Sequence, residues 1–291
     1  MPSQSRIILI TVLFNCEKHL STFFKSLGDQ DDKDFMIIIV DNNSQDTSRV
    51  YAEELAKKYH LPHEFIDNDS NLGVAAGNNH GIQRALQLGE HIVLINNDTS
   101  FKTDLVRNIR RRAIAIGIQA WTCLAYLADT EERWYGGGYL SYWRARGIHY
   151  DSKRSKKILE PEVVTYAPTC LMYLHATVFS SIGVMDPRYF VYYDDTDFCY
   201  RMNLAKVSLI YDPSVCISHY CGGSTGGPLS AFSIRIGTRN KFLYITKNYK
   251  LPHRWFVLGI AVISKMLQSA NPRLRRQIYL GFSDYLRMNK G

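Results

Sequence analysis

The sequence predicts an α/β fold: a mostly parallel sheet flanked by helices, with a helical appendage at the C-terminal end. Two observations predict it. Over roughly the first hundred residues, short apolar runs alternate with segments of helical spacing, which is typical of a parallel sheet with right-handed crossovers. Beyond residue 240 the chain becomes basic and aromatic, again with helical spacing. We therefore expect a sheet domain at residues 1–240 and a helical segment at residues 241–291.

The elements of the first half can be placed from their apolar spacing. Ile7–Phe14 is a nearly continuous apolar run that predicts a buried strand, and Cys16–Leu27 has apolar residues at helical intervals. The further expected elements are a strand at Phe35–Val40, a helix at Thr47–Tyr59, a short strand at Glu64–Ile66, a helix from the glycine-bearing turn Asn71–Gly77 to Leu88, and a strand at His91–Ile95.

The second half is less regular. Between Arg110 and Glu162, only Ile114–Leu127 predicts a strand, and the glycine-rich Trp134–Tyr139 is typical of a hairpin or a mobile loop. The remaining expected elements are a charged surface segment at Tyr150–Leu159, a strand at Cys170–Leu174, a helix reaching Ser181, a helical segment at Phe198–Leu204, a strand-like run at Ala205–Ser218, and C-terminal helices broken at Pro252 and Pro272.

The net charge of +8 indicates an anionic partner. Nucleic acid, acidic lipid and phosphorylated small molecules all carry the required charge. The sequence has no Arg/Gly-rich or aromatic RNA-binding pattern, and its basic residues do not gather into one long tract. We therefore expect no nucleic-acid partner.

Several features favour a cytoplasmic location. The six cysteines are scattered and include no CxxC pair, which is typical of reduced thiols. Ile7–Cys16 follows a basic residue but is not followed by a small-residue cleavage site, so a first strand is a better interpretation than a signal peptide. Val163–Met185 lacks formal charge, yet it contains proline, glycine and many hydroxyl groups, which favour a strand and short helix over a membrane span.

Polar clusters follow several of the expected strands. Asn96, Asn97 and Asp98 come directly after His91–Ile95, and a carboxylate flanked by amides at the carboxyl edge of a sheet offers hard ligands to Mg²⁺ or Mn²⁺. Taken by itself, this triplet is better explained by a plain Asn/Asp turn. Likewise, a purely structural role is open for each of two other residues. Asp41 could simply cap a helix, and His219 could simply be a hydrogen-bonded histidine of the core.

Asp194 and Asp195 are harder to explain by structure alone. They open a segment of helical character, where the helix dipole favours acidic side chains. Three acids within four residues, counting Asp197, exceed what capping requires. A carboxylate fixed at the start of a helix is a candidate general base, because the backbone sets its orientation.

The ordered series of these motifs resembles the inverting glycosyltransferases of family two, which have the GT-A fold, and most of all the bacterial rhamnosyl- and galactofuranosyl-transferase branch. The resemblance covers residues 7 to about 245. The matching segments are Leu13–Asn15 with Ser26, Leu27 and Gln30; Ile39–Asp46; Asn71–Gly73 with Ala76–Asn79, Gly81 and Ile82; Leu94–Asp98; Ile182, Gly183 and Asp186; Phe190–Cys199 with Arg201; and His219 with Gly222, Gly223 and Ser224.

The resemblance implies a role for each matching position. It places Asp195 as the catalytic base with Asp194 in support, and Asp98 with His219 as holders of a divalent metal, Mn²⁺ or Mg²⁺. Asn96 stands where many members have the first acid of the DXD motif. The positions implied to bind the nucleotide sugar are Phe14, Asn15, Asp41, Asn43, Asn71, Gly73, Asn96 and Asn97.

From this resemblance we expect transfer of a sugar, possibly rhamnose in view of the branch, from a dTDP- or UDP-linked donor to a hydroxyl of a surface glycan or lipid-linked glycan. The segment 252–291 has apolar spacing beside basic clusters, which predicts either peripheral contact with the inner face of the plasma membrane or packing in a homo-oligomer. Two alternatives remain open: a sugar nucleotidyltransferase and a non-catalytic nucleotide- or glycan-binding protein.

Overall fold

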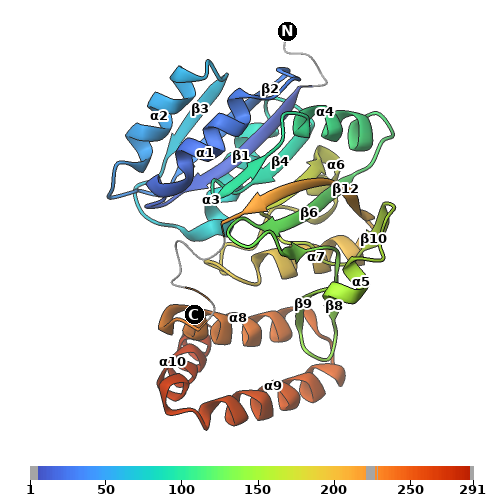
Figure 1. Cartoon of the computed structure of the whole chain (residues 1–291). Helices are drawn as coiled ribbons and strands as arrows, with labels where there is room; N and C mark the ends of the chain where they lie inside the picture. Colours follow the sequence, from blue (N-terminus) through green and yellow to red (C-terminus); the bar gives the residue numbers. More distant parts are fainter. Residues whose placement is uncertain (1–5, 221–226, 228, 289–291) are drawn as a thin grey trace.

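The computed structural model describes residues 6–220, 227 and 229–288 (Figure 1). The first half folds as the apolar spacing predicts. Its strands β1 (Ile7–Leu13), β2 (Phe35–Asp41), β3 (His63–Asp67) and β4 (His91–Ile95) alternate with the helices α1 (Glu17–Gly28), α2 (Ser48–Lys58) and α3 (Gly73–Ala85).

The main sheet has the order β10-β12-β6-β11-β4-β1-β2-β3. Its N-terminal strands are all parallel. β11 (Leu171–His175) enters antiparallel between β4 and β6 (Ala120–Leu127). β12 (Leu209–His219) runs parallel to β6 and antiparallel to both β10 (Glu162–Val164) and the short β5 (Thr99–Phe101). The expected α/β fold with a mostly parallel sheet is confirmed, and β11 is the inversion that the motif order did not indicate.

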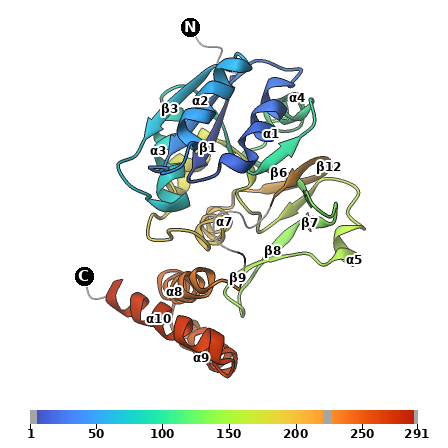
Figure 2. The same ribbon diagram turned by 60° about the vertical axis from the view of Figure 1, so that its left-hand side comes forward.

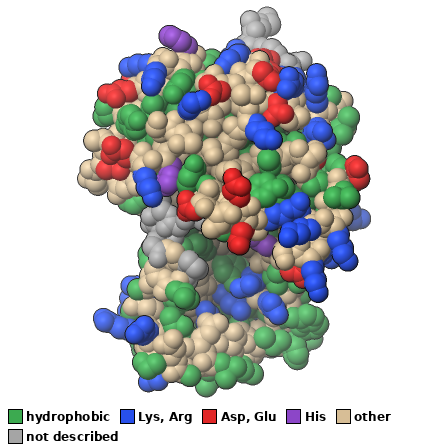
Figure 3. Space-filling view, in the orientation of Figure 1, with side chains coloured by type: hydrophobic (Ala, Val, Ile, Leu, Met, Phe, Trp, Pro, Cys, Tyr) green, Lys and Arg blue, Asp and Glu red, His purple; other side chains and the backbone are tan. Residues whose placement is uncertain are grey.

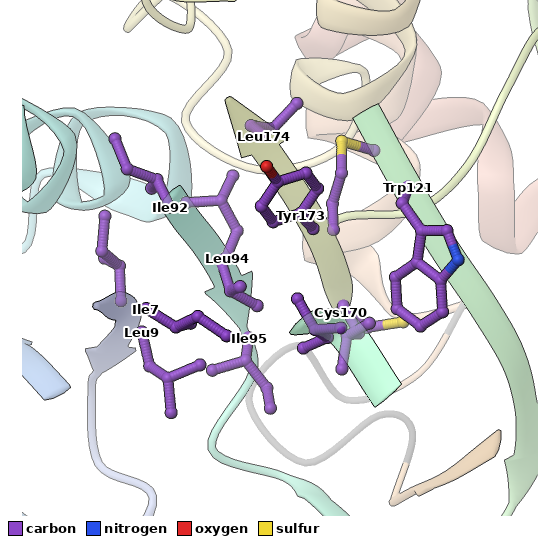
Figure 4. Close-up of a cluster of buried hydrophobic side chains, with 14 of the residues drawn as sticks. Ile7, Leu9, Ile92, Leu94, Ile95, Trp121, Cys170, Tyr173 and Leu174 are labelled. Atoms are coloured by element: carbon purple, nitrogen blue, oxygen red, sulfur yellow. The ribbon is translucent and has the colours of Figure 1, made fainter. Parts of the chain in front are cut away.

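Apolar side chains pack where the parallel strands β1 and β4 meet β11 and β6 in the sheet (Figure 4). The cluster brings together Ile7 and Leu9 of β1, Ile92, Leu94 and Ile95 of β4, Tyr173 and Leu174 of β11, and Trp121 of β6. All of these are buried. The pairing of β4 with β1 on one side and with β11 on the other sets its register, and the polar triplet begins directly after it.

The middle of the chain differs in detail from the expectation. A short helix α4 (Leu105–Ile109) and a π-helical turn η1 (Arg110–Ile114) precede β6, so the expected strand at Ile114–Leu127 forms only in its second part. The glycine-rich segment contributes β7 (Arg133–Tyr135), which pairs with β6, and the start of a hairpin. That hairpin pairs β8 (Gly138–Ser141) with β9, whose turn lies beyond the segment singled out in the sequence.

The segment after this hairpin is largely irregular. β9 is Arg146–His149, and the charged stretch that follows holds the single-turn helix α5 (Ser152–Ser155). After β11 come α6 (Ala176–Ile182) and α7 (Asp194–Leu204), which agree with the expected helices.

Three helices form the C-terminal part: α8 (Ala231–Asn248), α9 (His253–Ser269) and α10 (Pro272–Met288). Figures 1 and 2 show them below the α/β body, with the β8–β9 hairpin reaching down to them in both views. The expected boundary after residue 240 falls inside α8, so the division into two domains stays a prediction. Among the described helices, none combines the length and the apolar character needed to cross a bilayer.

A buried carboxylate ties α7 to these helices. Asp197 is fully buried and accepts hydrogen bonds from Lys247 Nζ and Asn248 Nδ2 of α8, each at 2.8 Å, and from Arg201 Nε at 2.9 Å. Arg201 also donates to two backbone carbonyl oxygens at and just after the end of α6. The buried charge is therefore paired on every side, as a charge removed from water must be.

We expect Asp197→Ala to lower the free energy of unfolding by about 3–5 kcal/mol, because it leaves Arg201 without its buried carboxylate and removes one of the two carboxylates that pair with Lys247. Urea denaturation measures this. The control is Asp284→Ala, which removes a more exposed pair with Arg235 and should cost about 1 kcal/mol or less. Equal losses in the two variants would contradict a special role for Asp197.

Candidate functional site

A pocket of about 330 Å³ lies at the carboxyl ends of β1 and β4, the edge at which open α/β sheets bind ligands. Six residues singled out in the sequence line it: Phe14, Asn71, Gly73, Asn96, Asn97 and Asp98. Phe190 and Val191, from the segment before α7, and Phe232, from the start of α8, complete its apolar wall. Sequence reasoning gave Phe232 no role, because an isolated apolar residue carries no signal of its own.

The turn before α3 explains why residue 73 is glycine. Gly73 has φ +82°, and a Cβ there would lie 2.2 Å from the Phe190 carbonyl oxygen. That oxygen accepts a hydrogen bond from the Val74 N–H at 2.7 Å, and Asn71 Oδ1 accepts one from the Gly73 N–H at 3.0 Å. The glycine thus allows the segment before α7 to approach α3, and both sides of this contact face the pocket.

Asp41 lies beside the pocket, not in its lining. It is 5% exposed, and its carboxylate accepts hydrogen bonds from the N–H of Ser44 at 3.0 Å and from the hydroxyl of Ser44 at 2.6 Å. The next residue, Asn42, lines the pocket and donates from Nδ2 to the Gly73 carbonyl oxygen at 3.0 Å. Asp41 therefore shapes the turn that carries a pocket residue, and its contact with a nucleotide stays a prediction.

Asn15 and Asn43 lie in the neighbouring turns that follow β1 and β2. Both are exposed and both have positive φ, 47° and 60°. Asn15 Oδ1 accepts a hydrogen bond from the Gln45 N–H at 2.8 Å, and Asn43 Nδ2 donates to the Asp69 carbonyl oxygen at 2.9 Å. The structure thus brings these two residues close to Asp41, outside the pocket lining.

Strand pairing brings Asp98 and His219 together. β5 begins directly after Asp98, and in its antiparallel ladder with β12 Thr99 lies opposite His219. The Tyr220 N–H donates to the Asp98 carbonyl oxygen at 2.8 Å. As a result Asp98 Oδ1 lies 3.1 Å from His219 Nε2, although the two residues are far apart in the sequence.

The chemistry of this pair fits a divalent metal. Asp98 Oδ1 is buried and accepts no aligned hydrogen bond from the described residues, and such an oxygen needs a cation or a donor. Carboxylate oxygen and imidazole nitrogen are both ligands for Mn²⁺. The described residues contain no cluster of three or more His, Cys, Asp or Glu side chains, so phosphate oxygens and water would have to complete the coordination, as is usual for Mg²⁺. Gly222, Gly223 and Ser224 of the resembling motif lie outside the described residues.

Trp134 packs beside the Asp98–His219 pair. Its ring contacts the His219 ring at a centroid distance of 4.6 Å and the His149 ring at 5.0 Å. The Trp134 carbonyl oxygen lies 2.7 Å from His149 Nδ1. Nothing in the motif order indicated Trp134, because β7 brings it to the site only through its pairing with β6.

The two acids at the start of α7 differ in exposure. Asp194 is 5% exposed, whereas Asp195 is partly exposed, so only Asp195 is open to a ligand. Burial raises the pKa of Asp194, and the neighbouring charge of Asp195 adds to the increase. Burial also raises the pKa of Asp195. A carboxylate of raised pKa that remains accessible is suited to accept a proton.

Tyr166 holds Asp195 in place. Its hydroxyl donates to Asp195 Oδ2 at 2.7 Å, and Asp195 Oδ1 accepts the Thr196 N–H at 2.6 Å. The His149 ring stacks on Tyr166 at a centroid distance of 5.8 Å. A continuous series of contacts therefore connects the Asp98–His219 pair to Asp195. It runs through Trp134, His149 and Tyr166. Tyr166 lies 29 residues before Asp195 in a segment without motifs, so the sequence could not reveal it.

Comparison with known proteins identifies the family. Residues 8–178, more than half of the chain, match the family described as glycosyl transferase family 2. The chain belongs to glycosyl transferase family 2. The family expected from the motif order is thus confirmed, whereas the comparisons do not single out the rhamnosyl- and galactofuranosyl-transferase branch.

Named relatives of the chain are sugar transferases, and a solved structure shares its fold. The chain is 24% identical over 212 residues to the low-salt glycan biosynthesis hexosyltransferase Agl10 of Haloferax volcanii, covering 71% of this chain and 66% of that protein. It is 29% identical over 110 residues to the cholesterol galactosyltransferase of Borreliella burgdorferi, covering 38% of this chain but only 30% of that protein. The fold resembles that of the mannosyltransferase PcManGT from Pyrobaculum calidifontis in complex with GDP-Man and Mn²⁺, with a TM-score of 0.59, 13% identity, and coverage of 95% of this chain and 84% of that chain.

In this family 2 domain we expect Tyr166→Phe to shift the pH dependence of kcat/KM for sugar transfer. The Tyr166 hydrogen bond favours the charged form of Asp195, so its loss raises the pKa of that carboxyl further. A base works only when ionised, and the acidic limb of the profile should therefore move to higher pH.

The matched control is Tyr135→Phe, which also removes a buried hydroxyl, one that donates to the Tyr166 carbonyl oxygen at 2.8 Å and not to Asp195. It should leave the position of the acidic limb unchanged. Identical pH profiles for wild type and Tyr166→Phe would refute the role of this hydrogen bond.

Proposed function

We propose that this chain is a metal-dependent, inverting glycosyltransferase that moves a hexose from a nucleoside diphosphate sugar to a hydroxyl group of a glycan acceptor. The observation that carries the proposal is the placement of Asp98 and His219. Their ligand atoms lie 3.1 Å apart, and Asp98 lines the pocket at the carboxyl edge of the sheet.

The pocket lining supports a nucleotide-sugar donor by its chemistry. The apolar side chains of Phe14 and Phe232 offer surfaces for a base or sugar, and Asn71, Asn96 and Asn97 bring amides to the same space. Asp98 and His219 would hold the metal, which when bound supplies positive charge against the leaving diphosphate. Positioning of the donor in this way contributes to the rate, because it replaces a random encounter by a fixed approach.

Asp195 acts as the base in this proposal. As the acceptor oxygen attacks the anomeric carbon from the face opposite the diphosphate, its proton passes to the Asp195 carboxylate, and the bond from carbon to diphosphate breaks. Attack from the opposite face inverts the anomeric configuration. Asp194 is too buried to reach an acceptor, and it supports the orientation of the helix start.

The proposal extends to the substrates and the location. Following the resembling branch, we propose a dTDP- or UDP-linked donor, with rhamnose as the sugar, and an acceptor that is a surface glycan or lipid-linked glycan. α9 exposes Trp255, Phe256, Ile263 and Leu267, which suits peripheral contact with the cytoplasmic face of the membrane; a homo-oligomer contact is the alternative for this face. Calorimetry with a panel of nucleotide sugars in the presence of Mn²⁺ identifies the donor.

Two other functions are less well supported. A sugar nucleotidyltransferase would need a glycine-rich loop with Arg and Lys after β1, where this chain has Asn15–Lys18. A non-catalytic binding protein would need neither the Asp98–His219 pair nor an accessible carboxylate of raised pKa at Asp195. Release of free sugar from a nucleotide sugar, measured without acceptor, separates an enzyme from a binding protein.

We expect EDTA to abolish transfer and Mn²⁺ or Mg²⁺ to restore it. In His219→Ala the affinity for Mn²⁺ in the presence of UDP, measured by calorimetry, should fall by ~10-fold or more because a ligand is lost. The control His175→Ala removes a histidine at the far end of β11 and should bind Mn²⁺ normally. Full activity of His219→Ala in EDTA would overturn the metal assignment.

We expect Asp195→Asn to lower the turnover number by ~10² or more, since an amide keeps the shape but cannot accept the proton. Donor binding, measured separately by calorimetry, should hardly change. Asp194→Asn should have the smaller effect. An active Asp195→Asn together with an inactive Asp194→Asn would show that the two roles are reversed.

A further inference from the structure

The tip of the β8–β9 hairpin is anchored on the C-terminal helices. Trp143 packs against His253 and Phe256 of α9, with ring centroids 5.1 and 5.5 Å apart. The Tyr249 hydroxyl, at the end of α8, donates to the Tyr142 carbonyl oxygen at 2.9 Å. These contacts fix the hairpin over the junction of α8 and α9, and they set the place of Arg146, which opens β9.

Three cations from three elements lie near one another at this junction. Lys241 of α8 and Lys265 of α9 are both partly buried, and each lies in the electrostatic field of Arg146; Lys241 also lies in the field of Lys265. No carboxylate of the described residues forms an ion pair with any of the three, and Lys265 donates to the neutral Gln268 side chain at 3.1 Å. Figure 3 shows a hollow above the C-terminal helices with Lys and Arg side chains along it.

This arrangement is unfavourable without an anion. Burial lowers the pKa of Lys241 to about 8, with added repulsion from Lys265 and Arg146, and burial likewise lowers the pKa of Lys265. Elsewhere in the chain the partly buried Lys247 is paired with Asp186 and Asp197. Three neighbouring cations without an acidic partner therefore form a surface that is complementary to a multiply charged anion.

An apolar cavity of about 300 Å³ adjoins the cations. It lies among α8, α9 and α10, and Lys265 is part of its lining together with Arg275. The rest of the lining is mainly apolar and includes Phe242, Val262, Ile278 and Phe282. A charged rim on an apolar cavity matches a ligand with a phosphate head and a hydrocarbon chain, whereas a free sugar or nucleotide would leave the cavity unfilled.

Arg146 also connects to the candidate base through β9. The same strand carries His149, which stacks on Tyr166, and the Tyr166 hydroxyl donates to Asp195. A head group held at Arg146 would thus lie on the side of the C-terminal helices from which an acceptor can approach Asp195.

We propose that Arg146, Lys241 and Lys265 bind the phosphate of a lipid-linked acceptor, and that the cavity beside Lys265 takes the first part of its hydrocarbon chain. This inference rests on the proposed function and assigns the acceptor class to residues of this chain. The donor diphosphate has its own site at Asp98 and His219, so the two phosphate groups bind on different elements.

The test is calorimetry on the full chain with dodecyl phosphate below its micellar concentration. Wild type should bind it at least ~10-fold more tightly than inorganic phosphate, which lacks the chain, and than dodecyl maltoside, which lacks the charge. The double variant Lys241→Gln/Lys265→Gln should lose ~10-fold or more of this affinity. Its melting temperature without ligand should be equal to or above that of wild type, since the repulsion between the cations is relieved.

The matched control is Lys156→Gln/Lys157→Gln, which removes two exposed charges after α5 and should bind dodecyl phosphate like wild type. Equal affinity for dodecyl phosphate and inorganic phosphate, or equal affinity in wild type and the Lys241/Lys265 variant, would overturn the inference. UDP and Mn²⁺ binding is measured on the same samples. If wild type binds UDP and Mn²⁺ but does not bind dodecyl phosphate, the lipid site is refuted and the proposed function stands. If wild type does not bind UDP and Mn²⁺, the proposed function is refuted.

Discussion

The buried charge of Asp197 is the constraint on which the arrangement of the site depends. One carboxylate binds Arg201 within α7 and Lys247 and Asn248 of α8, so the helix that presents Asp195 is joined to the C-terminal helices by charge-assisted hydrogen bonds. Since a buried charge tolerates no missing partner, α7 cannot rotate or shift without a large cost. The start of α7, where the candidate base lies, is therefore held by a residue of its own first turn.

The sheet topology supplies the other half of the site. β11 enters antiparallel between β4 and β6, and β12 then returns beside the short β5. This path places His219, the last residue of β12, against Asp98, which follows β4. The approach of Asp98 and His219 is thus a product of strand register, because the pairing of β5 with β12 sets His219 opposite Thr99.

Charge is distributed with a clear division of roles. At the start of α7, Asp194 is buried and Asp195 is partly buried, and desolvation raises the pKa of both carboxyl groups. Arg146, Lys241 and Lys265 form no ion pair with a carboxylate of the described residues, and they lie on the C-terminal side, around the β8–β9 hairpin. The rings of Trp134, His149 and Tyr166 form a continuous series of aromatic contacts from the Asp98–His219 pair to Asp195.

The sequence by itself determined the alternating strands and helices of the first half, the family, and the polar residues at the strand ends, because apolar periodicity and motif order are local properties of the chain. It also pointed to Asp98, His219 and the acids of α7 before any contact was known. Only the tertiary structure decided that β11 is antiparallel, that Asp41 bonds Ser44 beside the pocket, and that Trp134, Tyr166 and Phe232 belong to the site. Those facts depend on which strands pair and which helices pack. The sequence around each of these residues does not indicate which distant residues it will contact.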